Sequence, residues 1–522
     1  MTSSIDAAEC ERAAIRAYLL GADDDCARHW ESAHRAALAA GSPAEAARYA
    51  FWLGLGLMFR GQTAHANGWF ARAETLIAEA GAECRASGYV LIPRCLAALG
   101  ADDPQHAHAL GVRTAEIGGR FDDTDLRAFG TLSQGQALIA LGETVAGVAR
   151  FDEVMVSATT GELGPITTGI VYCAVILECM ELFDLRRASE WTDALAAWCD
   201  AQPELVPYRG QCLVHRSQLQ QAGGNWSEAV ASVRSALRHL ADPPHPALGL
   251  ALYQEGEMHR LRGQFEQAED NYRQASGYGH DPMPGLALLQ LARGDGSAAA
   301  ATIQRALAES GSGRSRPALL AAAVETFRST GDFAAARAAA EDLSMIAAAS
   351  TSQVLHAMAA TAIGSVLIGA GDVASALVEL RKAARTWQSL HMPYDAARTA
   401  LLVGLACAAL GDKNGAEVEF DCASDVFTRL GAVPDLERVN ALTAGLADGV
   451  SPRGAAAETA ALSAREREVL AHLASGQTNR QIAADLVVSA HTVARHVEHI
   501  YAKLGVTNRA AATAYAYEHH LV

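Results

Sequence analysis

The feature that most constrains the fold is a short sequence motif that recurs about every 40 residues: a glycine, an acidic or polar residue, then alanines. Three copies, at Gly331, Gly371 and Gly411, lie 40 residues apart. The other copies begin at Gly21, Gly61, Gly100, Gly142, Gly224, Gly263 and Gly294, with a degenerate one at Phe183 and Asp184. Most intervals are 37 to 42 residues, and only the step from Gly263 to Gly294 is clearly shorter. A left-handed glycine commonly ends one helix and an acidic residue starts the next, so each copy predicts the turn of a helix pair.

The helices of such a pair are predicted to be amphipathic. After Gly371, small and apolar residues share one face at Ala376, Leu377, Leu380, Ala383, Ala384 and Trp387. One pair cannot bury its apolar face alone, so adjacent pairs must stack. We therefore predict an all-α protein in which residues 1–442 form a right-handed α-solenoid of about eleven helix pairs, with a concave face for a ligand or partner. This region resembles the tetratricopeptide-type repeat, although its period exceeds the roughly 34 residues of that family and no binding residues carry over.

Composition narrows the class of protein. Half of the residues are hydrophobic and 19% are charged, which is typical of a folded chain. The ten cysteines, from Cys10 to Cys422, form no CxxC pair and lie in alanine-rich helical patterns, so we expect buried free thiols and no structural metal. No uninterrupted apolar run reaches the roughly 18 residues of a membrane span, and the start carries acids where a signal peptide carries positive charge. These features predict a cytoplasmic protein without membrane contact.

Charge is distributed unevenly between the two ends. The whole chain has a formal net charge of −17, which argues against nucleic-acid binding over the entire surface. From Pro452 onward, seven basic residues face six acidic ones, so this tail carries +1 and the remainder −18. Any nucleic-acid contact is therefore expected in the tail.

The tail contains three dense helix signals. Ser463 to Glu466 is a capping box that opens a helix closed by Gly476, with Val469, Leu470, Leu473 and Ala474 inside. Thr478 to Gln481 is a second capping box, before a short helix with Ile482, Ala483 and Leu486 inside. Ser489 caps a third helix, 490–504, which Gly505 ends and whose inner stripe is Val493, Val497, Ile500 and Leu504. Two short helices joined by a tight turn predict a helix-turn-helix.

The string from Leu462 to Ala516 resembles the C-terminal DNA-binding domain of the LuxR/FixJ family without a gap. The shared pieces include Arg465-Glu-Arg-Glu-Val-Leu470, Gly476-Gln-Thr-Asn-Arg-Gln-Ile-Ala483 and Lys503-Leu-Gly-Val506. The resemblance implies four helices over 462–522, with Ala494, Arg495 and Glu498 facing the major groove beside His491. It also implies phosphate contacts from Thr478, Arg480, Ser489, Thr492, Lys503 and Arg509. Positions 494 and 498 are often basic in that family but are Ala and Glu here, which leaves Arg495 as the expected reader of guanine.

Other tail residues have structural interpretations. Arg465 and Glu466 are expected to form a structural pair and cap, and His496 is expected to be packed and hydrogen-bonded in the core or a turn. The helix from about 509 to 519 has a family counterpart that forms the dimer contact on DNA. The resemblance thus implies dimerisation through Ala511, Ala514, Tyr515 and Glu518. Residues 443–461, rich in Gly, Ser and Pro, are predicted to be a flexible linker.

Enzyme signatures are absent from the sequence. The only lysines are Lys382, Lys413 and Lys503, and none stands in a Walker A loop, so no ATP-binding domain of the large LuxR-type regulators is expected. His106 and His108 lack further ligands at useful spacing for a metal site, and no nucleophile motif occurs. We expect no catalytic residue and no cofactor.

These features predict a sequence-specific DNA-binding transcription regulator whose repeats sense an unidentified protein or small-molecule effector. Double-stranded DNA, a second copy of the chain and RNA polymerase are the candidate partners. The alternative is a protein-interaction scaffold with a DNA-tethering tail.

Overall fold

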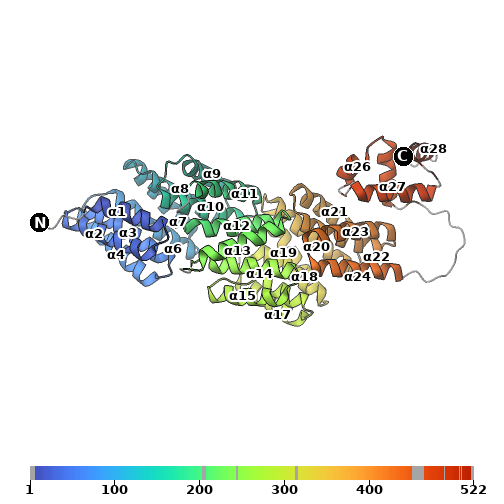
Figure 1. Cartoon of the computed structure of the whole chain (residues 1–522), viewed down its shortest axis with the longest axis horizontal. Helices are drawn as coiled ribbons and strands as arrows, with labels where there is room; N and C mark the ends of the chain where they lie inside the picture. Colours follow the sequence, from blue (N-terminus) through green and yellow to red (C-terminus); the bar gives the residue numbers. More distant parts are fainter. Residues whose placement is uncertain are drawn as a thin grey trace. The chain divides into compact units, whose positions relative to one another are not determined.

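The computed structural model describes residues 6–202, 207–242, 245–311, 315–448, 462, 464–486, 488, 490–504, 506 and 508–518. The elements in these ranges are α-helices joined by short turns (Figure 1). The chain divides into two compact units. Unit 1 comprises residues 1–219, 229–254 and 275–280, and unit 2 comprises residues 220–228, 255–274 and 281–522.

Unit 1 contains the first eleven helices. They are α1 (Ala7–Leu19), α2 (Asp23–Ala39), α3 (Pro43–Phe59), α4 (Thr63–Ala80), α5 (Arg85–Tyr89), α6 (Leu91–Gly100), α7 (Pro104–Arg120), α8 (Thr124–Ala140), α9 (Thr144–Thr159), α10 (Pro165–Glu181) and α11 (Leu185–Asp200). The next four helices contribute residues to both units: α12 (Pro207–Ala222), α13 (Trp226–Leu240), α14 (Leu248–Leu261) and α15 (Phe265–Gly277).

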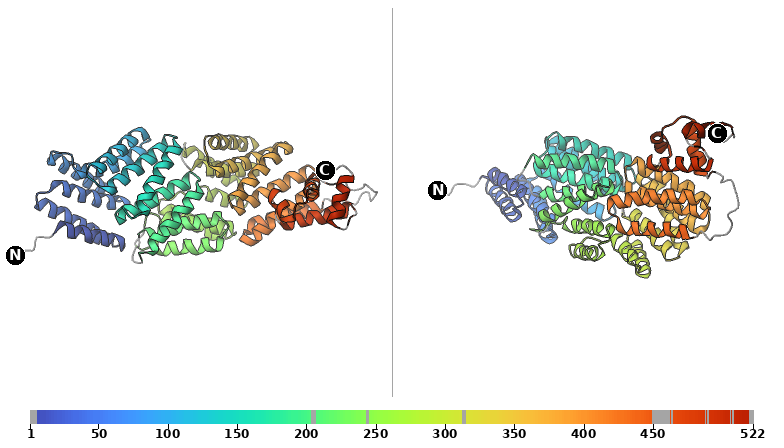
Figure 2. Two further views of the ribbon diagram at one scale, coloured as in Figure 1. Left: turned by 90° about the horizontal axis from the view of Figure 1, so that it is seen from above. Right: turned by 45° about the vertical axis from the view of Figure 1, so that its right-hand side comes forward.

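Unit 2 contains the remaining helices. Those before the tail are α16 (Gly285–Ala292), α17 (Gly296–Glu309), α18 (Arg316–Ser329), α19 (Phe333–Ala348), α20 (Gln353–Ala370), α21 (Val373–Ser389), α22 (Pro393–Ala409), α23 (Lys413–Leu430) and α24 (Val433–Asp448). If α5 and α6 are counted together as the first helix of one pair, the described helices before α24 form eleven consecutive pairs. This confirms the predicted all-α repeat of about eleven helix pairs. Figure 2 shows the hairpins within each unit from two further directions.

The predicted turn, a left-handed glycine followed by a capping residue, is confirmed at most copies of the motif. Gly331, Gly371 and Gly411 have φ of 83°, 83° and 80°. The side chain of the aspartate that follows each glycine accepts a hydrogen bond from the backbone N–H three residues on. These bonds join Asp332 to Ala335 at 3.0 Å, Asp372 to Ser375 at 3.3 Å and Asp412 to Gly415 at 3.0 Å. The glycine therefore reverses the chain and the carboxylate starts the second helix.

Gly100 departs from the predicted role. It is the last residue of α6 rather than a left-handed cap, and Asp102, with φ of 59°, reverses the chain instead. Asp103 then accepts from the N–H of His106 at 3.1 Å. Aspartate tolerates the left-handed region better than most residues, so the turn forms two residues later than the glycine suggested. The degenerate copy is confirmed, because Phe183 has φ of 56° and Asp184 caps α11.

The short interval between Gly263 and Gly294 has a local cause. The helix α16 contains only 8 residues, whereas α20 and α22 contain 18 and 17. Each unit nevertheless buries many apolar side chains, a large share of them alanines, and these form several separate clusters. In α21, Ala376, Leu380, Ala383 and Trp387 are buried, as the helical spacing predicted.

One helix in the described part of the chain is long and apolar enough to cross a membrane by length and composition alone. This helix is α20, and half of its 18 residues are buried inside the protein. The expectation of no such segment was therefore too strict, because the few polar residues of α20, such as His356, interrupt the apolar run but leave the helix apolar on average. A core helix of this kind packs against α19 and α21.

The end of the repeats also differs from the prediction. The helix α24 continues to Asp448, so residues 443–448 of the expected linker are helical. These residues keep apolar positions at helical spacing, and glycine at 445 is tolerated near a helix end. The rest of the expected linker, residues 449–461, lies outside the described residues.

Candidate nucleic-acid interface

Four helices at the end of unit 2 share a core of their own. They are α25 (Ala464–Ala474), α26 (Asn479–Leu486), α27 (Ala490–Leu504) and α28 (Arg509–Glu518). The core residues are Leu462, Val469, Leu470, Leu473, Ile482, Ala483, Leu486, Val493, Val497, Ile500, Ala512 and Ala516. The predicted inner stripes of the first three helices are confirmed, with Ala474 and Leu504 partly buried at the edge. The shared core therefore fixes the position of α27 against α25 and α26.

The second predicted capping box is present. The backbone N–H of Gln481 donates to Thr478 Oγ1 at 3.3 Å, and the backbone N–H of Thr478 donates to Gln481 Oε1 at 2.9 Å. Gly476, with φ of 85°, ends α25 as expected. Ser463, Ser489 and Gly505, predicted to cap or end the other helices, lie outside the described residues. The turn before α26 is thus fixed by reciprocal side-chain hydrogen bonds.

Several charged side chains of the tail hold its helices together. The carboxylate of Glu466 is fully buried and pairs with Lys503 Nζ of α27 at 2.7 Å. Arg465 donates to Glu468 at 2.8 Å and to the carbonyl oxygen of Leu486 at 2.6 Å. Both side chains therefore bond within the domain, but Arg465 pairs with Glu468 and Glu466 with Lys503 rather than with each other, and the expected cap at Ser463 lies outside the described residues. A buried ion pair that loses one partner destabilises strongly, so Lys503 is part of the framework.

Arg509 also contacts the framework. Its guanidinium donates to the carbonyl oxygen of Gln477 and, at 3.4 Å, to Asn479 Oδ1. These two acceptors lie at the start of α26, whereas Arg509 begins α28. Arg509 therefore links the fourth helix to the turn before the second.

His496 lies inside the domain rather than on its surface. It is fully buried, and neither ring nitrogen has a hydrogen-bond partner among the described residues. The packing prediction is confirmed, whereas the expected hydrogen bond is not found in the described part. Burial, reinforced by the positive charge of Arg465, lowers the pKa of His496 to about 4. The imidazole is neutral in the folded domain near neutral pH.

The predicted DNA contacts fall into three groups. Thr478 and Arg480 at the start of α26 are exposed, as are Arg495 and Glu498 on α27, with Ala494 half-buried beside them. Thr492 is buried at 7% exposure, and Lys503 and Arg509 make the framework bonds above. His491 lies on α27, but its side chain is outside the described part, as are those of Ala514 and Glu518 on α28. Among the predicted contacts whose side chains are described, Thr478, Arg480, Arg495 and Glu498 are thus the exposed ones.

Two bonds join α27 to the repeat helix α23 within unit 2. Arg495 forms an ion pair with Asp421, and Thr492 Oγ1 lies 2.8 Å from Cys422 Sγ. The sequence does not indicate this contact, because the partners are about 70 residues apart and no local pattern marks such a pair.

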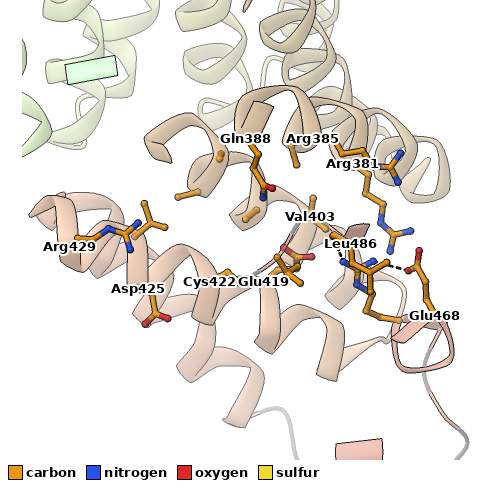
Figure 3. Close-up of a pocket in the computed structure, with 17 residues that line it drawn as sticks. Arg381, Arg385, Gln388, Val403, Glu419, Cys422, Asp425, Arg429, Glu468 and Leu486 are labelled. Atoms are coloured by element: carbon orange, nitrogen blue, oxygen red, sulfur yellow. Dashed lines mark hydrogen bonds and ion pairs between the residues drawn. The ribbon is translucent and has the colours of Figure 1, made fainter. Parts of the chain in front are cut away.

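A cavity of about 230 Å³ lies next to this contact (Figure 3). The repeat helices α21, α22 and α23 supply most of its wall, and Arg465, Glu468, Leu486 and Val488 of the tail supply the rest. Burial raises the pKa of Glu419 in this wall, with Arg465 and Arg381 opposing the rise. The cavity thus has lining residues from both the repeats and the tail.

The cysteines match the prediction of free thiols. All ten are unpaired, and only Cys84 and Cys422 are less than fully buried. Within the described ranges, no group of three or more His, Cys, Asp or Glu side chains is arranged to hold a metal ion.

Comparison with known proteins identifies the tail. Residues 460–516 match the family described as bacterial regulatory proteins, luxR family. The C-terminal domain is a LuxR-type helix-turn-helix. The chain is 49% identical over 81 residues to a probable transcriptional regulatory protein NarL of Mycobacterium tuberculosis, a match that covers 16% of this chain and 37% of that protein. It is 58% identical over 53 residues to a probable transcriptional regulatory protein SgaR of Hyphomicrobium methylovorum, covering 10% and 25% of the two chains. The match thus spans well under half of each relative.

Solved structures of other helical proteins resemble about half or more of the chain, and more distantly. A tetratricopeptide repeat protein from Parabacteroides merdae has a TM-score of 0.32 at 15% identity, covering 53% of this chain and 98% of its own. A Rap protein complexed with competence and sporulation factor has a TM-score of 0.34 at 11% identity, covering 70% and 98%.

Proposed function

We propose that the protein is a sequence-specific DNA-binding transcription regulator whose LuxR-type domain reads duplex DNA. The observation that carries the proposal is the exposure of polar and charged side chains at the start of α26 and on α27, in a domain matched to luxR-family regulators. An α-helix on such a support fits the major groove. The tail's charge of +1 suits a module that relies on specific contacts rather than on general attraction to phosphates.

The side chains have distinct proposed roles. Arg495 reads guanine through two parallel hydrogen bonds to O6 and N7, and Glu498 accepts from cytosine N4. Thr478 and Arg480 contact phosphates, which their exposure permits. Ser489, His491, Thr492 and Ala494 complete the proposed surface. Lys503 and Arg509 already donate hydrogen bonds within the domain. They would contact phosphates only through their remaining N–H groups.

The repeats are proposed to sense an effector and to control the LuxR-type domain. The cavity between α21, α22, α23 and the tail supports this role, because a molecule bound there would touch both parts. Arg381, Arg385 and Arg429 in its wall make no ion pair with another described residue, which favours an effector with an anionic group. Such a regulator would act in the cytoplasm, with RNA polymerase as a further partner.

Dimerisation on DNA is proposed to use α28. Ala511 and Tyr515 are half-buried on this helix, while Ala512 and Ala516 fill the domain core on its other side. With Ala514 and Glu518 they would form a two-fold contact that brings two half-sites under one protein. Two weakly basic modules would then bind more tightly than one.

The test is a binding selection on residues 452–522 with random duplexes, followed by mobility shifts on the selected duplex. Losing a bidentate guanine contact costs about 1–3 kcal/mol, so Arg495→Ala should weaken binding about tenfold or more and relax specificity at one base pair. Arg467→Ala is the matched control, because Arg467 is an exposed arginine of α25 outside the proposed surface. If no duplex is enriched, or if the two variants behave alike, the proposal fails.

A further inference from the structure

A second cavity, of about 1000 Å³, lies entirely within unit 1. The helices α1, α2 and α3 supply one part of its wall, and the end of α13, residues 245–246 and Tyr278 supply the other. Its volume is at the upper end of the range of about 300–1,000 Å³ that is typical of small-molecule sites. Segments far apart in the sequence therefore enclose a space large enough for an organic ligand.

An aromatic pair forms the apolar part of the wall. The rings of Trp30 on α2 and Trp52 on α3 stack with their centroids 6.1 Å apart and their planes 13° from parallel. Tyr49 packs against Trp30 at 5.9 Å, so the pair is held in place from α3. The apolar wall continues along α3 through Leu53, Leu57 and Met58. Aromatic side chains that are already ordered bind a flat apolar group with little further loss of side-chain entropy.

The polar part of the wall is acidic. It includes the three aspartates of the first turn of α2, whereas its one described arginine is Arg60 and it has no described lysine. Asp24 pairs with Arg60 at 2.8 Å, and Asp25 pairs with Arg28 on the same helix. Asp23 has no ion pair with another described residue. The wall thus carries one carboxylate without a cation of its own.

The nearest titratable neighbour does not supply that cation. His245, across the cavity, is within electrostatic reach of Asp23, but its Nδ1 accepts a hydrogen bond from the backbone N–H of Ala247 at 3.1 Å. Burial also lowers the pKa of His245, with Asp23 opposing, so the ring is uncharged near neutral pH. Burial raises the pKa of Asp23, and the charges of Arg60 and His245 oppose the rise. A cationic group beside Asp23 would compensate the cost of burying its charge.

We propose that this cavity binds an amphipathic organic cation, a molecule that carries a protonated amine on a flat apolar body. The amine donates to Asp23, and the apolar body lies against Trp30 and Trp52. The cavity next to the LuxR-type domain has arginines without ion pairs among the described residues, so the two cavities favour ligands of opposite charge. The inference does not depend on the reading of DNA, because every described wall residue belongs to unit 1.

The first test compares three fluorescent probes that share a dansyl group and differ in charge. Monodansylcadaverine carries a primary ammonium, N-pentyl dansylamide is neutral, and dansyl-ε-aminocaproate carries a carboxylate. Each is titrated into the full chain at about neutral pH without DNA, and the dansyl emission is followed. The ammonium probe should bind saturably and about tenfold or more tightly than the neutral probe, as expected for a hydrogen bond to a charged group. The carboxylate probe should bind most weakly.

The second test removes the charge of Asp23. Asp23→Asn should weaken binding of the ammonium probe about tenfold and leave binding of the neutral probe unchanged, because the apolar wall stays intact. Asp193→Asn is the matched control, since Asp193 is an exposed aspartate of α11 outside the cavity and without an ion pair to a described residue. This control should change neither affinity.

The third test fills the cavity. An added Cβ meets no atom within 4 Å at either Gly56, in the cavity wall on α3, or Gly68, exposed on α4. Gly56→Phe should therefore occupy the space of the ligand and weaken binding of both the ammonium and the neutral probe about tenfold or more. Gly68→Phe adds the same ring outside the cavity and should leave both affinities unchanged.

Four results would each overturn the inference. They are no saturable binding of the ammonium probe, binding of the neutral or carboxylate probe as tight as that of the ammonium probe, equal effects of Asp23→Asn and Asp193→Asn, and wild-type affinities in Gly56→Phe. The proposed function is tested separately by duplex selection on residues 452–522, which contribute nothing to this cavity. A failure of one proposal is therefore distinguishable from a failure of the other.

Discussion

The buried imidazole of His496 should make the stability of the LuxR-type domain depend on pH. This side chain is fully buried, and its ring nitrogens have no hydrogen-bond partner among the described residues. Burial, with help from the charges of Arg465, His499 and Lys503, lowers the pKa of His496 from 6.5 to about 4, while Glu466 opposes the shift. The proposed perturbation is His496→Leu, which keeps a buried side chain at this position and removes the titrating group.

The sign follows from the proton balance. Between a pH of about 6.5 and about 4, the imidazole binds a proton in the unfolded chain but not in the folded domain, so acid favours unfolding. The stabilisation is therefore complete above the unfolded pKa and is lost as the pH falls through this window. With one pKa unit worth about 1.4 kcal/mol, acidification from about pH 7 to about pH 5 should lower the free energy of unfolding by about 2 kcal/mol.

The assay is urea unfolding of residues 452–522 at several pH values, followed by far-ultraviolet circular dichroism. The His496→Leu variant should lack the loss of about 2 kcal/mol that the wild-type domain shows, so the difference between the two should grow as the pH falls. His499→Leu, at a half-buried position on the same helix, should keep most of the wild-type dependence, because burial and Arg465 contribute more than His499 to the lowered pKa of His496. Parallel pH curves for wild type and His496→Leu would refute the reasoning.

Two other predictions concern the repeats. An added Cβ meets no atom within 4 Å at either Gly61 or Gly68, but Gly61 has φ of 71° and Gly68 lies exposed inside α4. Gly61→Ala should therefore destabilise by about 1–2 kcal/mol and Gly68→Ala should stabilise by about 0.5–1 kcal/mol, and denaturation midpoints that move in the same direction would contradict this. Trp387 is buried and donates to Thr361 Oγ1 at 3.2 Å, so Trp387→Ala should cost about 3–5 kcal/mol in denaturant titrations. Trp387→Phe should cost less because it retains most of the ring contacts, and equal losses would argue against a packing role.

Much of the fold could be predicted because its signals are local. The turn at Gly371 needs a residue in the left-handed conformation, and the carboxylate of Asp372, the next residue, caps the backbone N–H of Ser375. The capping box from Thr478 to Gln481 has the same character. Such interactions are encoded within four or five residues, so they can be recognised without knowledge of the tertiary structure. Near Gly100 both a glycine and an aspartate could adopt the left-handed conformation that ends the helix. The predicted position of the turn was wrong there by two residues, because Asp102 adopts it instead of Gly100.

The sequence by itself determined the helical hairpins, the inner stripes of the tail and the identity of its helix-turn-helix, because periodicity and caps are properties of neighbouring residues. Only the tertiary structure decided which charged side chains remain available on that domain. Lys503 and Arg509 look like phosphate contacts in the sequence but bond to Glu466, Gln477 and Asn479, and Arg495 meets Asp421 of α23. These partners are separated by about 30 to 74 residues, and the free energy of a pair depends on burial and distance that no local pattern encodes.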